Sequence, residues 1–174
     1  MSTKWRQRVS KITFKLETDF DLELDFVLIG ISSSLRDYRL CHFVNKHTNL
    51  ELTHGKEDYL DHKGIPKEKS RNEMDYHIIY DQRRGKTPTT QHFKTFRYIN
   101  NTYDHEYYLI SNRGEEGGLL IPEAANFDYF ILIKHFIDQD DLKKLIESLK
   151  SVADILLVKE IDPIILKSKE NLIF

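Results

Sequence analysis

The C-terminal third of the chain contains two strongly apolar runs separated by an amphipathic segment, and this pattern constrains the fold most. Residues 127–136 and 155–158 are apolar on both faces, as strands are when both sides of a sheet are covered. Between them, Asp138 is a candidate N-cap for a helix over 138–151. The apolar stripe of that helix consists of Leu142, Leu145, Ile146 and Leu149. The pattern predicts a strand–helix–strand unit with parallel strands and a right-handed crossover.

The first half of the chain predicts a further strand and a second helix. Residues 11–17 alternate between apolar and polar side chains, and residues 26–31 are apolar on both faces. Ser34 is a candidate N-cap for a short helix over 34–47, with acidic Asp37 three residues later. Cys41 lies on the apolar stripe of that helix, so we expect its thiol in the core.

The middle of the chain alternates between charged loops and strand-like runs. Residues 55–72 and 82–92 are rich in charge, with glycine and proline, and are predicted to be loops. Strand-like runs cover 74–80, 93–99 and 105–111, and the last two flank a turn, which predicts an antiparallel hairpin. We therefore expect residues 1–174 to form a single α+β domain. Its sheet is mostly antiparallel, with the two main helices packed on one face.

The composition narrows the classes of partner. The 26 basic residues nearly balance the 28 acidic ones, so no strong global field attracts nucleic acid or an anionic membrane. A single cysteine cannot form an internal disulfide, which favours a reducing cytoplasm. No apolar window is long enough to span a bilayer, so we expect a cytoplasmic protein without a membrane partner.

The string Ile-Pro-Glu-x-x-x-Phe-Asp-Tyr begins at residue 121 and is the most distinctive motif. Pro122 lacks an N–H, so it is expected to end a short strand at 119–121, and Glu123 begins the turn into the next strand. Glu123 and Asp128 either bind backbone N–H groups and cations or converge on a ligand or a metal. The structural role is favoured because buried polar groups are usually hydrogen-bonded. Tyr129 is expected in the core.

With this string, the chain resembles the bacterial IPExxxVDY family, with Phe127 at the position of the Val. The resemblance covers most of the chain outside the two long loops. It extends to residues 30–33, 37–40, 107–112 and 168–172. Because that family is defined by its sequence, the resemblance implies no catalytic residue and no cofactor.

A basic loop and the histidines are two further candidates for binding sites. Arg83, Arg84 and Lys86 form a basic loop that, with residues 4–8, is a candidate nucleic-acid contact. The same loop has the Gly-Lys-Thr ending of a phosphate-binding loop but lacks the first glycine of that motif. The eight histidines show no recognised ligand spacing, so we expect no metal site.

The sequence therefore favours a small cytoplasmic binding or accessory protein without catalysis. It would contact a protein partner, or a second copy of itself, through the motif surface formed by Pro122, Glu123, Asp128 and Tyr129. An RNA-binding accessory protein using residues 4–8 and 83–86 is the alternative. A hydrolase or metal enzyme using Glu123 and Asp128 is a third reading.

Overall fold

The computed structural model describes residues 24–54, 76–81, 87–100, 105–135 and 137–173. Within these ranges the strands are β1 (Phe26–Ser33), β2 (Tyr76–Asp81), β3 (Thr89–Asn100), β4 (His105–Ser111), β5 (Tyr129–Lys134) and β6 (Ile155–Ile161). The helices are α1 (Asp37–Thr48) and α3 (Gln139–Lys150). Short 3-10 turns are η1 (Pro122–Ala124), η2 (Pro163–Ile165) and η3 (Lys169–Leu172).

The strands form one sheet in the order β2-β3-β4-β5-β1-β6, and every neighbouring pair is antiparallel. The predicted antiparallel α+β domain is therefore confirmed. The C-terminal strand–helix–strand unit is also present as β5, α3 and β6. Its two strands run in the same direction because both are antiparallel to β1, but β1 lies between them.

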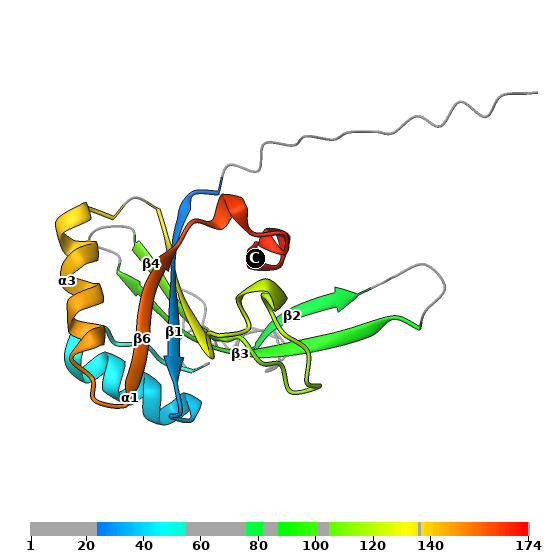
Figure 1. The fold of residues 1–174 in the computed structure, drawn as a ribbon, viewed down its shortest axis with the longest axis horizontal. Coiled ribbons are helices and arrows are strands. Elements are labelled where there is room, and N and C mark those ends of the chain that lie inside the picture. The colour runs from blue at the N-terminus through cyan, green and yellow to red at the C-terminus, as the bar shows by residue number, and fades with distance from the viewer. Residues whose placement is uncertain (1–23, 55–75, 82–86, 101–104, 136, 174) are drawn as a thin grey trace, which may run out of the picture.

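The two helices lie side by side on one face of the sheet (Figure 1). Helix α3 begins as predicted, since the Asp138 side chain accepts a hydrogen bond from the Asp140 N–H at 2.9 Å. Cys41 is a buried residue of α1, and its burial raises the pKa of its thiol to about 11. These contacts confirm the predicted apolar stripes of both helices.

The start of α1 differs from the prediction. The helix begins at Asp37, with Arg36 at the N-cap and no side-chain cap, so Ser34 is not the capping residue. The preceding serine is used in the turn instead. The hydroxyl of Ser33 donates to the Asp154 carbonyl at 2.8 Å and accepts from the Leu35 N–H at 3.2 Å. Residues 34–36 therefore connect β1 to α1 without helical structure.

Among the described residues, no α-helix covers the second face of the sheet. This face is covered by residues 120–128, which we call the motif segment, and by the C-terminal turns η2 and η3. Figure 1 shows these turns on the side opposite α1 and α3. Their buried side chains pack against the strands and are Leu120, Ile121, Phe127, Leu166 and Leu172. This second layer explains why β1 and β5 are apolar on both faces.

Four sequence expectations need correction or lie outside the described residues. Strand β3 begins at Thr89, so the predicted loop 82–92 extends too far. The polar residues at the start of β3 pair with β2 in the hairpin that projects from the sheet in Figure 1. The expected strand at 119–121 is only an isolated bridge between Leu119 and Arg113, because the next two N–H groups bind Asn112. Residues 11–17 and 55–72 are not among the described residues.

Gly30 in β1 tests the packing of the motif segment on the second face. A Cβ at this position would lie 2.7 Å from the Phe127 ring and 2.8 Å from Cδ1 of Ile161. We expect Gly30→Ala to lower the free energy of unfolding by about 1–3 kcal/mol through overpacking, measured by chemical denaturation. Ser34→Ala is the exposed control. An unchanged midpoint for Gly30→Ala would show that Phe127 does not pack on β1.

Candidate functional site

The motif segment is organised by one buried side chain, that of Asn112 at the end of β4. Its Nδ2 donates to the carbonyls of Ala124 at 3.2 Å and Phe127 at 2.8 Å, and its Oδ1 accepts from the Ile121 N–H at 2.9 Å. The backbone of Asn112 also bonds to Leu120 and Asp128. The amide thus fixes the path of residues 120–128 over the sheet.

Glu123 binds the C-terminal segment. Its carboxylate accepts hydrogen bonds from the Ser168 N–H at 2.7 Å and from the Ser168 hydroxyl at 2.9 Å. Partial burial raises the pKa of Glu123, but the hydrogen bonds from Ser168 outweigh it and bring the pKa below the ordinary value of 4.5. This carboxylate therefore joins η1 to the turns that cover the second face.

Asp128 binds a different segment. Its Oδ2 accepts from the Ser33 N–H at 2.9 Å and from the Ser32 hydroxyl at 3.3 Å, which fixes the end of β1. The hydrogen bonds of Glu123 and Asp128 therefore do not converge on one group. Each carboxylate ties the motif segment to a separate part of the chain.

The remaining motif residues lie at the start of η1 and of β5. Pro122 is exposed at the first position of η1. Tyr129 is buried as expected, and its hydroxyl shares its one hydrogen between the Leu35 carbonyl at 2.7 Å and Asp37 Oδ1 at 3.2 Å. Burial and the nearby Asp37 raise the pKa of Tyr129 above its ordinary value.

Asp128 and Tyr129 also line a pocket of about 390 Å³. It lies between the connection from β1 to α1 and the glycine-rich turn that follows β4. Glu123 is not part of its lining. The structure thus brings two of the four predicted motif residues to one pocket, whereas Glu123 binds the C-terminal segment and Pro122 is exposed at the start of η1.

The other sequence-based candidates are not placed. Arg83, Arg84, Lys86 and residues 4–8 lie outside the described residues. Across the part of the chain that the structure describes, no group of three or more His, Cys, Asp or Glu residues could hold a metal ion. Neither described helix is long and apolar enough to cross a membrane.

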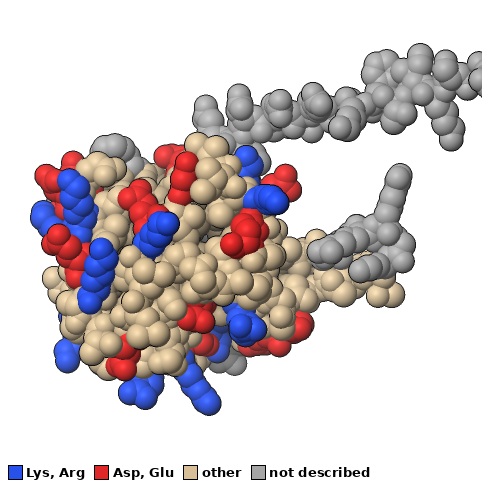
Figure 2. All heavy atoms as spheres, viewed as in Figure 1, with Lys and Arg blue, Asp and Glu red and all other residues tan. Residues whose placement is uncertain are grey.

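A second surface, not expected from the sequence, lies along β6. This strand is last in the sheet order and pairs only with β1 among the described strands. Leu156 is 77% exposed, and in the following turn Ile164 and Ile165 are 69% and 74% exposed. Figure 2 shows charged side chains gathered over the α3 side, whereas the middle of the same face carries few. We call Leu156, Leu157, Ile164 and Ile165 the β6 edge surface.

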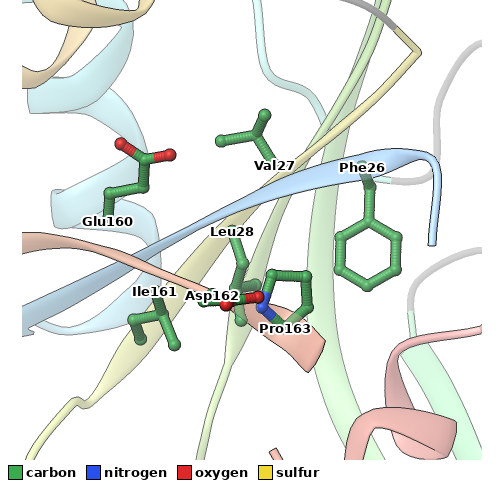
Figure 3. Close-up of a pocket in the computed structure, with 7 residues that line it drawn as sticks. All are labelled: Phe26, Val27, Leu28, Glu160, Ile161, Asp162 and Pro163. Atoms are coloured by element: carbon green, nitrogen blue, oxygen red, sulfur yellow. The ribbon is translucent and has the colours of Figure 1, made fainter. Parts of the chain in front are cut away.

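An apolar pocket of about 380 Å³ lies at the end of this edge. Phe26, Leu28, Ile161 and Pro163 lie on one side of the β1 ribbon, while Val27 and Glu160 point to the other (Figure 3). The pocket therefore joins the start of β1 to the turn that carries Ile164 and Ile165. It extends the β6 edge surface toward the second face of the sheet.

The sequence prediction that residues 155–158 are buried on both faces is wrong for Leu156 and Leu157. Ile155 and Val158 are buried, but the two leucines between them are exposed. The pairing with β1 shifts register between Ser32 and Ser33, so Leu156 has no paired position on β1. An apolar run alone does not distinguish a central strand from an edge strand with exposed leucines.

Comparison of the chain with protein-family models, with curated proteins and with solved structures gave no match. The resemblance to the IPExxxVDY family therefore stays a prediction from the sequence.

The contact between Glu123 and Ser168 predicts a pH dependence of stability. Because the folded-state pKa of Glu123 is lowered, the stabilisation is present above pH 4.5 and is lost as the pH falls through the folded-state pKa. The carboxylate is exposed, so we expect no more than about 1 kcal/mol. Denaturant unfolding of the parent and Glu123→Gln should differ at pH 7 and converge near pH 3.

Glu170→Gln removes an exposed carboxylate from the same C-terminal segment and serves as the matched control. A difference between parent and Glu123→Gln that stays constant from pH 7 to pH 3 would contradict the proposed role of the Glu123 carboxylate.

Proposed function

We propose that the chain is a non-catalytic protein-binding module whose partner adds an extended segment to the edge of β6 that no described strand pairs with. The observation that carries this proposal is the combination of an edge strand with the exposed aliphatic side chains of the β6 edge surface. Leu156 at the start of β6 and Ile165 in the turn after its end are each about three-quarters exposed, so aliphatic side chains are exposed at both ends of this edge strand.

The backbone of β6 can accept an added strand. An edge strand presents N–H and C=O groups that no neighbouring strand satisfies, and proteins usually protect such edges with charges, proline or a covering element. Lys159 and Glu160 protect one end of β6, whereas the Leu156–Leu157 end has only aliphatic side chains. An added strand would satisfy the backbone there, and its apolar side chains would cover the leucines.

The contacts of the motif residues support a binding role over catalysis. Glu123 and Asp128 accept hydrogen bonds from Ser168 and Ser33 respectively, in two different segments. A general acid and base acting on one substrate would have to reach the same reacting group. These bonds instead favour a structural role for both carboxylates, with recognition at other surfaces.

Three parts of this proposal come from the sequence. They are the cytoplasmic location, membership of the IPExxxVDY family, and a partner that is another protein or a second copy of the chain. RNA binding through residues 83–86 stays a prediction, because those residues lie outside the described part of the structure.

Photo-crosslinking tests the location of the interface. We expect a photoreactive amino acid at position 156 to crosslink the partner from cells of the native source, because Leu156 lies on the β6 edge surface. The same group at Lys143 on α3, or at Asn126 in the motif segment, should give little product, since both exposed positions lie elsewhere. The partner is identified by mass spectrometry, and light scattering detects self-association.

Leu156→Glu should abolish the crosslink formed from position 157 while changing the free energy of unfolding by less than about 0.5 kcal/mol, because Leu156 is exposed. Crosslinking mainly from position 126 would move the interface to the predicted motif surface. Equal crosslinking in the Leu156→Glu variant would reject the β6 edge.

A further inference from the structure

The helix-facing side of the sheet carries a row of polar side chains beyond the N-terminus of α1. Tyr76 of β2 pairs with Lys94 of β3, and Ser111 of β4 pairs with Tyr129 of β5. Thr95 pairs with Ile110, which brings Lys94 and Ser111 to adjacent positions on β3 and β4. Lys94, Ser111 and Tyr129 thus form part of the lining of the 390 Å³ pocket.

The walls of this pocket come from the connection between β1 and α1 and from the glycine-rich turn after β4. They contribute Asp37, Arg113, Glu115 and Asp128. With Lys94, the lining contains three carboxylates and two cations, for a net charge of −1. The volume falls within the usual range for small-molecule sites, about 300–1,000 Å³.

Some of these charged groups already have partners. Lys94 Nζ lies 3.2 Å from Asp37 Oδ2, and Asp37 Oδ1 accepts the hydrogen bond from the Tyr129 hydroxyl. Each oxygen of Asp37 therefore has a partner in the lining. The Tyr76 hydroxyl donates to Glu115 Oε1 at 2.7 Å. Glu115 thus takes part in the packing of the pocket through one oxygen only.

Three groups of the lining keep binding capacity. Glu115 and Asp128 each use only one carboxylate oxygen in the contacts between described residues. The guanidinium of Arg113 is exposed and makes no hydrogen bond or ion pair with another described residue; only its backbone carbonyl is used, by Ser111. The pocket therefore offers a strong cationic donor and two anionic acceptors.

We propose that this pocket binds a small zwitterion of the amino-acid type, either a free amino acid or a dipeptide. Arg113 binds the ligand carboxylate, because a guanidinium matches a carboxylate with two parallel hydrogen bonds. Glu115 and Asp128 accept hydrogen bonds from the ligand ammonium group. Ser111 provides a neutral hydroxyl on the floor between these charges.

Ligands of a single charge fit this lining less well. A simple anion would meet Arg113 but also three carboxylates, and the net charge of the lining opposes it. A simple cation would leave the Arg113 guanidinium facing a like charge. A zwitterion matches both signs and adds no net charge to the pocket. This site is separate from the β6 edge surface, so it does not depend on the proposed function.

Solution NMR of the full chain tests this proposal. The probes are each of the common amino acids and glycylglycine, titrated to about 10 mM while the backbone amide signals of the protein are recorded. We expect saturable shifts at Ser111, Arg113 and Tyr129 for at least one probe. The N-acetylated and C-amidated forms of that probe, which each lack one charge, should bind at least about tenfold more weakly.

Matched variants assign the two charges. Arg113→Gln should weaken binding of the zwitterion at least about tenfold and leave the C-amidated form unaffected, since that form has no carboxylate. Glu115→Gln should weaken binding of the zwitterion and leave binding of the N-acetylated form unaffected. Arg39→Gln, at an exposed position of α1 outside the pocket lining, is the control and should bind as the parent does.

The proposal would be overturned if none of the probes caused saturable shifts. Equal affinity for the zwitterion and both blocked forms would also overturn it, because binding would then not depend on the two charges. Shifts confined to β6 would assign any observed binding to the other surface.

Discussion

The buried amide of Asn112 is the interaction on which the second face of this sheet depends. Asn112 is only 1% exposed, and its side chain satisfies the Ile121 N–H and the carbonyls of Ala124 and Phe127. These backbone groups belong to a segment without strand or α-helix, so it has no ladder of its own to pair them. A buried and fully bonded amide replaces that ladder and gives the segment one path.

Four motif residues then tie this segment to other parts of the chain. Phe127 lies against Gly30, Glu123 binds Ser168, and Asp128 binds the end of β1. The hydroxyl of Tyr129 reaches the start of α1. The distinctive sequence string therefore accounts for much of the contact between this segment and the rest of the described chain. The two proposed binding surfaces, the β6 edge surface and the polar pocket beside Arg113, lie among the described residues.

The elements predicted correctly from the sequence are those governed by local periodicity. The stripe and cap of α3 and the hairpin of β3 and β4 depend on neighbours in sequence. The predictions that were wrong depended on tertiary partners: the serine turn before α1 is bonded to Asp154, and Leu156 lies at a register shift on an edge strand. The pocket could not be predicted because register across four strands brings its residues together.

Replacing Asn112 tests the central claim most directly. Asn112→Leu keeps a similar volume but leaves the Ile121 N–H and the Phe127 carbonyl without their partner, and the Ala124 carbonyl with only the Phe127 N–H, so we expect a loss of roughly 3 kcal/mol in unfolding free energy. Hydrogen exchange should also show that the Ile121 amide loses protection more than the amides of α3. Asn126→Ala, at an exposed position of the same segment, should change neither quantity. Parent-like stability and parent-like protection of Ile121 in Asn112→Leu would contradict the account.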